Sequence, residues 1–149
     1  SVLQDPEGLK LCIHEMMYLL EGVEFDLILG TEARGFLVGM PIAYNKHKGF
    51  IAARKKGKLP RETICKEYAL EYGADAIEIH KDSIFPGQRV VIVDDLTPQG
   101  GTSKACIDLV EELGGQVVKI IFVMELAGLK GRELLKGYDV ASALVYPGI

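Results

Sequence analysis

The sequence predicts an α/β domain built on a mainly parallel, twisted sheet that is flanked by helices. Short apolar segments alternate with segments of helical periodicity, which is typical of a parallel sheet with helices on both faces. The segments 89–95 and 117–126 contain long apolar runs, as expected for strands that are covered on both faces. With 149 residues, 48% of them hydrophobic, the chain can bury a normal core. We therefore expect a single domain over residues 1–149.

The first half of the chain begins with a predicted helix at 5–22. Asp5 followed by Pro6 is a helix-start signal, apolar residues then recur at helical spacing, and Gly22 can close the helix. The next predicted elements are a strand at 26–30, a helix at 35–49 and a strand at 49–54.

The stretch from Lys55 to Asp75 has little apolar periodicity and contains three glycine or proline breaks. Five cations lie within residues 54–61. We expect a long, mobile functional loop at 55–75. The elements predicted after this loop are a strand of period two at 76–80, a strand at 89–95, a helix at 103–115, a strand at 117–126, a helix at 128–137 and a strand at 139–145.

Composition excludes several classes of protein. A net charge of −4 argues against a nucleic-acid binder that relies on a general basic field. The sequence contains no run of about 18 uncharged apolar residues and no secretory signal pattern, so we expect a cytoplasmic protein without a membrane partner. Cys12, Cys65 and Cys106 are odd in number and form no CxxC pair, which argues against a disulfide framework or a structural zinc site.

The most informative segment is VVIVDDLTPQGGT at 90–102, where an apolar strand ends in Asp94 and Asp95 and continues into a glycine turn before a helix. In open α/β sheets, ligands bind beyond the carboxyl ends of the strands. The helix start and the Thr102 hydroxyl suit a phosphate. The carboxylates suit a sugar diol or a magnesium ion. A sugar phosphate satisfies both halves, and the alternative is a glycine turn that binds no ligand.

This segment resembles the 5-phosphoribosyl-1-pyrophosphate (PRPP) motif of the type I phosphoribosyltransferases. Other segments resemble the adenine phosphoribosyltransferases in particular: residues 32–36 their pyrophosphate loop, 54–60 and 68–73 their mobile catalytic loop, 77–82 the strand after that loop, and 125–132 their late strand-to-helix turn. The motifs occur in the family's order and span nearly the whole chain. The resemblance implies the type I phosphoribosyltransferase fold.

The resemblance also implies a reaction, in which adenine and magnesium-bound PRPP give AMP and pyrophosphate in purine salvage, and a homodimer. Glu71 is then expected to exchange a proton with the purine and Tyr72 to close over the active site, while Asp94 and Asp95 hold the ribose hydroxyls. The residues expected at the 5′-phosphate are Pro98, Gln99, Gly100, Gly101 and Thr102. Those expected at the pyrophosphate are Glu32, Ala33, Arg34, Arg54, Lys55 and Lys58. Mg²⁺ is expected to be held mainly by PRPP rather than by protein side chains.

Two departures from the family keep alternatives open. Pro98 and Gln99 replace the family's usual Ala-Thr, and proline offers no N–H to a phosphate. The family also has an N-terminal hood over adenine, and we expect this chain to begin after most of it. The alternatives are a non-catalytic PRPP-sensing regulator or degenerate paralogue, and a phosphoribosyltransferase for another purine base. For the basic residues of 54–61, the alternative is a solvated loop, and for Glu71 an exposed strand-edge acid.

Overall fold

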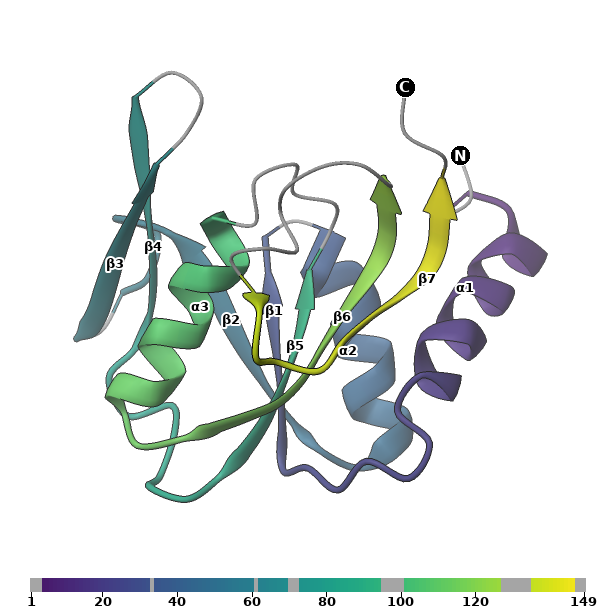
Figure 1. The fold of residues 1–149 in the computed structure, drawn as a ribbon, viewed down its shortest axis with the longest axis horizontal. Coiled ribbons are helices and arrows are strands. Elements are labelled where there is room, and N and C mark those ends of the chain that lie inside the picture. The colour runs from purple at the N-terminus through teal and green to yellow at the C-terminus, as the bar shows by residue number, and fades with distance from the viewer. Residues whose placement is uncertain are drawn as a thin grey trace.

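The computed structural model describes residues 4–32, 34–60, 62–69, 73–94, 101–126 and 135–146. Within them the chain forms a seven-stranded sheet with the strand order β3-β4-β2-β1-β5-β6-β7 (Figure 1). The strands are β1 Leu27–Thr31, β2 Gly49–Lys55, β3 Thr63–Ala69, β4 Ala74–His80, β5 Arg89–Asp94, β6 Gln116–Leu126 and β7 Val140–Tyr146. The helices are α1 Pro6–Tyr18, α2 Arg34–Lys46 and α3 Gly101–Glu112.

The sheet is mainly parallel, as predicted. β1 pairs in parallel with β2 on one side and with β5 on the other, and β5, β6 and β7 continue the parallel arrangement. Only the pairings of β4, with β2 and with β3, are antiparallel among the described strands. From the central pair β1 and β5, the sheet therefore continues through β2, β4 and β3 on one side and through β6 and β7 on the other. The carboxyl ends of these two strands form the switch point at which α/β sheets bind ligands.

The helices cover both faces of the sheet (Figure 1). On one face α3 packs Ile107 and Leu109 into a core that includes Leu29 of β1. On the other face, α1 and α2 pack against a second core, which includes Ile28 of β1. Ile28 and Leu29 are both fully buried because successive strand residues point to opposite faces. This arrangement explains why the central strands are continuously apolar.

The turn from β1 into α2 depends on close backbone packing at Gly30. A Cβ atom at this position would lie 2.6 Å from the carbonyl oxygen of Gly35 and 2.8 Å from Cζ of Phe50. Neither distance can be accommodated without movement, and the first contact is to backbone. Glycine at position 30 therefore lets the start of α2 lie directly against the end of β1, which sets the positions of Glu32 and Arg34.

The prediction of a continuous loop at 55–75 was wrong in one respect, because residues 63–69 form β3. This strand pairs with β4 from Thr63↔His80 to Ala69↔Ala74. It lies at the edge of the sheet, and its middle residues, 65–67, are all exposed. Of its residues, Ile64 and Tyr68 pack against the core, and the exposed Lys66 lies between them, so the strand has no regular apolar alternation and the sequence pattern gave no signal for it.

The other predicted elements differ from the observed ones at their ends. The first helix ends at Tyr18 rather than at residue 22, and α3 begins at Gly101 and ends at Glu112. The strand predicted at 76–80 begins at Ala74. Of the helix predicted at 128–137, residues 128–134 lie outside the described part of the chain.

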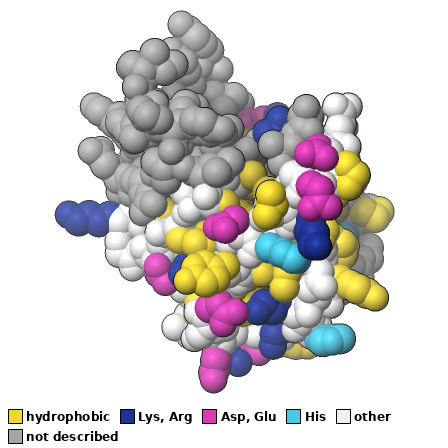
Figure 2. Space-filling model, turned by 90° about the vertical axis from the view of Figure 1, so that its right-hand side faces the viewer, with side chains coloured by type: hydrophobic (Ala, Val, Ile, Leu, Met, Phe, Trp, Pro, Cys, Tyr) yellow, Lys and Arg dark blue, Asp and Glu magenta, His cyan; other side chains and the backbone are white. Residues whose placement is uncertain are grey.

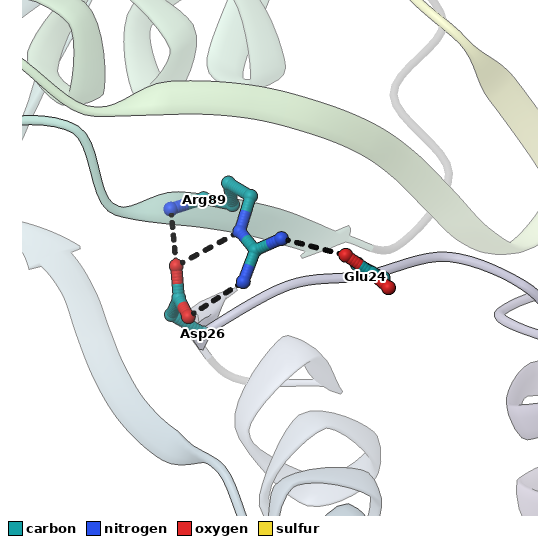
Figure 3. A network of polar contacts seen from close by, with 3 residues as sticks. All are labelled: Glu24, Asp26 and Arg89. Atoms are coloured by element: carbon teal, nitrogen blue, oxygen red, sulfur yellow. Dashed lines mark hydrogen bonds and ion pairs between the residues drawn. The ribbon is translucent and has the colours of Figure 1, made fainter.

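Asp26 and Arg89 join the amino ends of β1 and β5 (Figure 3). The backbone N–H of Arg89 donates to Asp26 Oδ2 at 2.8 Å, while its guanidinium donates to both carboxylate oxygens at 3.2 and 3.1 Å. Glu24 accepts a further bond from the guanidinium at 3.1 Å. The hydrogen bonds from Arg89 lower the pKa of Asp26 to about 2. This cluster fixes the two central strands at the edge of the sheet opposite to their carboxyl ends.

The face that carries α1 mixes hydrophobic, acidic and basic side chains (Figure 2). From α1 itself, Leu11 and Tyr18 are 63% and 71% exposed. Among the helices in the described ranges, none combines the length and the apolar character that a membrane crossing requires.

Candidate active site

Asp94 joins three elements at the switch point. It ends β5, it is only 4% exposed, and its two carboxylate oxygens accept hydrogen bonds from different elements. Thr31, the last residue of β1, donates its hydroxyl to Oδ1, and Ser103, in the first turn of α3, donates to Oδ2 at 2.8 Å. Because a buried carboxylate is costly without such donors, these contacts hold the strand ends and the helix start together.

This geometry bears on the predicted ribose site. Asp94 lies at the carboxyl edge of the sheet, as expected, but it also has a positioning role that the sequence did not indicate. A carboxylate offers about four acceptor sites, so contacts to Thr31 and Ser103 are compatible with a further contact to a sugar hydroxyl. Asp95, the second predicted ribose ligand, lies outside the described residues.

The N-terminus of α3 lies beside Asp94 and begins with Gly101 and Thr102, two of the predicted phosphate residues. The first N–H groups of an α-helix have no partner within the helix and carry partial positive charge, which favours an anion. The other three predicted phosphate residues, Pro98, Gln99 and Gly100, lie outside the described part of the chain.

The end of β3 packs against this helix N-terminus. A Cβ atom on Gly101 would lie 3.4 Å from the carbonyl oxygen of Ala69 and 3.5 Å from Cδ2 of Tyr68. The side chains of Tyr68 and Thr102 are hydrogen-bonded, and burial is the main cause that raises the pKa of Tyr68. The β3–β4 hairpin therefore reaches the predicted phosphate site.

Glu71 and Tyr72, the predicted catalytic residues, lie outside the described residues. The chain enters this segment from Ala69 and leaves it at Gly73, and Ala69 pairs with Ala74 across the hairpin. Because Ala69 also lies against Gly101, the segment that carries Glu71 starts beside the α3 N-terminus. The role of Glu71 therefore stays a prediction.

Glu32 organises the cations at the end of β2. One of its carboxylate oxygens accepts a hydrogen bond from the backbone N–H of Lys55, and the other lies 3.7 Å from a guanidinium nitrogen of Arg54. The Arg54 guanidinium also lies 6.0 Å from the ring centre of Phe36. A carboxylate repels an anion, so any contribution of Glu32 to the predicted pyrophosphate site would be made through Arg54 and Lys55, which it contacts.

Lys55 is bound to the hairpin through Asp75. Its ammonium lies 2.9 Å from Asp75 Oδ2, and the other oxygen of Asp75 accepts the backbone N–H of Ala76 at 2.8 Å. The hydrogen bond to Asp75 is the largest cause of the raised pKa of Lys55, and the pKa of Asp75 is lowered by the same bond. A phosphate that binds Lys55 must therefore compete with Asp75.

The remaining predicted pyrophosphate residues follow the ends of β1 and β2. Arg34 is the exposed first residue of α2, and the exposed Lys58 lies in the turn after β2. Ala33 lies outside the described residues. Since β1 and β2 run parallel and pair through Thr31↔Ala53, the structure brings Arg34, Arg54 and Lys55 to the same edge of the sheet as Asp94.

Within the described ranges, no three His, Cys, Asp or Glu side chains are grouped closely enough to hold a metal ion. The three cysteines are free thiols, and burial raises the pKa of Cys106 well above its usual value. The expectation that Mg²⁺ is held mainly by PRPP stays a prediction, because the acids Glu71 and Asp95 lie outside the described residues.

Sequence reasoning assigned no role to Thr31, Ser103 or Tyr68. Thr31 was identifiable only as a polar end to an apolar strand, and Ser103 as a small polar residue after the glycine pair. The proximity of Thr31 to Asp94 depends on β1 lying next to β5, which the alternation of elements does not specify. Ser103 is only nine residues from Asp94 in the chain, but its type alone did not indicate the contact. Tyr68 was placed in a loop, whereas it lies in β3 beside α3.

The comparisons with known proteins agree with this architecture. The phosphoribosyl transferase domain matches residues 2–143. An adenine phosphoribosyltransferase from Lachnoclostridium phytofermentans is 62% identical over 148 residues, which cover 99% of this chain and 85% of that protein. The crystal structure of the enzyme from Thermoanaerobacter pseudethanolicus has a TM-score of 0.94 at 53% identity and covers 97% of this chain and 84% of its own.

A third relative provides a ligand-bound structure. The adenine phosphoribosyltransferase of Saccharomyces cerevisiae, solved in complex with adenine and an imino-altritol bisphosphate, has a TM-score of 0.88 at 38% identity. The match covers 95% of this chain and 82% of the yeast chain. The fold and the site together thus define a phosphoribosyl transferase domain of type I. Within that class, the chain belongs to the adenine phosphoribosyltransferase family.

Proposed function

We propose that this protein transfers the 5-phosphoribosyl group from PRPP to adenine and releases AMP and pyrophosphate. The observation that carries the proposal is the convergence of three features at one edge of the sheet: the Asp94 strand end, the N-terminus of α3 and the cations at the ends of β1 and β2. They match the ribose, the phosphate and the pyrophosphate of a single substrate. Membership of the adenine phosphoribosyltransferase family supports adenine as the base.

In this reaction the bond between ribose C1′ and the pyrophosphate oxygen breaks, and pyrophosphate leaves with the electron pair. A bond forms between C1′ and an imidazole nitrogen of adenine, and the proton on that ring must be accepted. We assign this proton to Glu71, with Tyr72 closing over the site. The carboxylates of Asp94 and Asp95 hold the ribose hydroxyls and favour the positive charge that develops on the sugar.

The anionic ends of PRPP have separate partners. Residues 98–102, including the N-terminus of α3, bind the 5′-phosphate. Arg34, Arg54, Lys55 and Lys58 stabilise the leaving pyrophosphate, while Glu32 holds two of these cations in place. Magnesium, expected to be held mainly by PRPP itself rather than by protein side chains, would offset part of the charge of the leaving group when bound.

Steady-state assays with adenine, hypoxanthine and guanine, each with PRPP and magnesium, test the proposal and its nearest rival. We expect adenine to be used far more efficiently than the other two bases. Preference for hypoxanthine or guanine would assign the enzyme to another base. Binding of PRPP in a calorimeter without product from any base would indicate the non-catalytic regulator.

We also propose that the protein is a homodimer of the cytoplasm. Leu37, Met40 and Tyr44 of α2 are 55%, 52% and 80% exposed in the single chain, and their spacing places them on one side of the helix. The three free thiols suit a reducing compartment. Light scattering coupled to size-exclusion chromatography tests the dimer. We expect twice the chain mass, and the mass of a single chain for Tyr44→Glu if this face is the interface.

A further inference from the structure

Glu78 is a buried acid that the proposed reaction does not use. It lies in β4, is 5% exposed and accepts three hydrogen bonds. Its Oε1 accepts the backbone N–H groups of Gly57 at 3.2 Å and Leu59 at 3.1 Å, and its Oε2 accepts the hydroxyl of Thr63 at 3.1 Å. Gly57 and Leu59 lie in the connection between β2 and β3, and Thr63 is the first residue of β3.

The backbone of residues 56–59 is arranged around the Glu78 carboxylate. Gly57 has φ +91°, a conformation that other residues rarely adopt, and the N–H of Lys58 donates to the carbonyl of Lys55 at 3.2 Å. The N–H of Lys56 donates to Ala76 on β4 at 3.1 Å. Neighbouring N–H groups that converge in this way bind an anion, and here the anion is a side chain of the protein itself.

The charge of the segment explains the need for an internal acid. Arg54, Lys55, Lys56, Lys58 and Arg61 place five positive charges within eight residues. Like charges at this density repel one another and favour extended conformations of the chain. A carboxylate beneath the backbone offsets part of that repulsion. Because the carboxylate also holds the backbone, the exposed side chains of Lys56 and Lys58 extend from a backbone of defined geometry.

We propose that Glu78 is a positioning residue for the basic segment 55–58. Its carboxylate fixes the backbone at Gly57 and Leu59, and the lysines of the segment are thereby presented to the pyrophosphate of PRPP. Glu78 itself does not contact substrate. The part of this proposal that concerns PRPP rests on the proposed function, whereas the part that concerns the backbone does not.

The kinetic test compares Glu78→Ala with Glu78→Gln. The glutamine amide oxygen can still accept from Gly57 and Leu59, and its NH₂ group can donate to Thr63, so this variant should retain the arrangement. We expect Glu78→Ala to raise the KM for PRPP about tenfold, with kcat and the KM for adenine changed less than about threefold. Glu78→Gln should restore the KM to within about threefold of wild type. Glu67→Ala, at an exposed position on β3, is the matched control and should leave all three constants unchanged.

Limited digestion with trypsin provides a readout that needs no activity. Trypsin cleaves after Lys and Arg, and the segment contains a cluster of such sites. We expect Glu78→Ala to be cut within 55–58 several times faster than wild type, and Glu78→Gln and Glu67→Ala to behave like wild type. Faster cutting in a protein whose wild type forms no AMP would support the positioning role and contradict the proposed function. An unchanged KM for PRPP together with an unchanged cleavage rate would overturn the proposal.

Thr63→Ala provides the test if Glu78→Ala does not fold. It removes only the donor to Oε2, so we expect a smaller change in the same direction, about two- to threefold in both the KM for PRPP and the cleavage rate. A folded Thr63→Ala variant with neither change would overturn the proposal.

Discussion

Ser103 donates a hydrogen bond of 2.8 Å to Asp94, and both side chains are buried. The two residues stand on either side of the turn predicted to hold the 5′-phosphate, so this bond closes the base of the turn. Thr31 donates to the other oxygen of Asp94 and extends the same contact to β1. The acid that ends β5 therefore fixes the helix N-terminus and the neighbouring strand at once.

Replacing Ser103 with alanine tests this closure. The change leaves Oδ2 of a buried carboxylate without its donor, and we expect a loss of about 1–3 kcal/mol in the free energy of unfolding, measured with urea. The KM for PRPP should rise as well, because the start of α3 is held less firmly. Ser83→Ala, in the turn after β4, is a matched control. Equal stability of Ser103→Ala and wild type would contradict the role assigned to the bond.

Glu71→Ala should lower kcat by about 10² or more if Glu71 exchanges the purine proton. The KM for PRPP should change little, because the residue is assigned to the base rather than to the phosphates. Glu67→Ala, which removes an exposed acid from the same hairpin, controls for a general change of charge. A turnover number that is the same in Glu71→Ala and wild type would remove Glu71 from the mechanism.

Asp75→Asn tests the competition for Lys55. The ion pair between Asp75 and Lys55 is partly exposed, so the effect should be modest. We expect pyrophosphate to bind about two- to threefold more tightly to the variant at low ionic strength, with the difference disappearing at high salt. Isothermal titration calorimetry measures both affinities. Weaker binding to the variant would mean that Asp75 positions Lys55 for the anion instead of competing with it.

Introducing the family's Ala-Thr at positions 98 and 99 tests whether Pro98 and Gln99 weaken the binding of PRPP. The double change Pro98→Ala and Gln99→Thr adds a backbone N–H and a short hydroxyl to the turn, so we expect PRPP to bind more tightly. The dissociation constant of PRPP measures the effect. Equal affinity before and after the change would show that the turn tolerates Pro98 and Gln99.

The contact between Asp26 and Arg89 predicts a pH dependence of stability. The folded-state pKa of Asp26 is about 2, below its ordinary value of 3.8, so the pair stabilises the fold above that ordinary value. The contribution is lost as the pH falls through 3.8 towards 2. Asp26→Asn should therefore melt below wild type at about pH 7, and the gap should narrow as the pH falls towards the folded-state pKa. A gap of constant size down to that pH would contradict this assignment.

The central part of the fold was predictable because it leaves a strong pattern in the sequence. Ile28 and Leu29 face opposite cores, and the residues of β5 from Val90 to Val93 are all fully buried, so these strands read as continuous apolar runs. The strand β3 was not predictable in the same way. Its exposed residues Cys65, Lys66 and Glu67 face solvent, and its pairing with β4 depends on backbone hydrogen bonds that any sequence can form.

The places of the candidate site residues were predictable where a residue stands at a strand end or a helix start. Asp94 was expected at the end of a strand and Thr102 at the start of a helix, and the structure places them there. Thr31 and Tyr68 were not, because their partners are distant in the sequence and meet them only through the strand order and the packing of β3 on α3. Glu32 was assigned to the pyrophosphate through the resemblance of residues 32–36 to the family's pyrophosphate loop, and only the structure shows that it accepts the backbone N–H of Lys55.

The central claim is that one edge of the sheet binds PRPP and transfers its phosphoribosyl group to adenine. The most direct measurement is the formation of AMP and pyrophosphate by the full-length protein incubated with adenine, PRPP and magnesium. We predict one pyrophosphate released for each AMP formed, and no AMP when PRPP is omitted. Failure to form AMP under conditions in which PRPP is bound would contradict the claim.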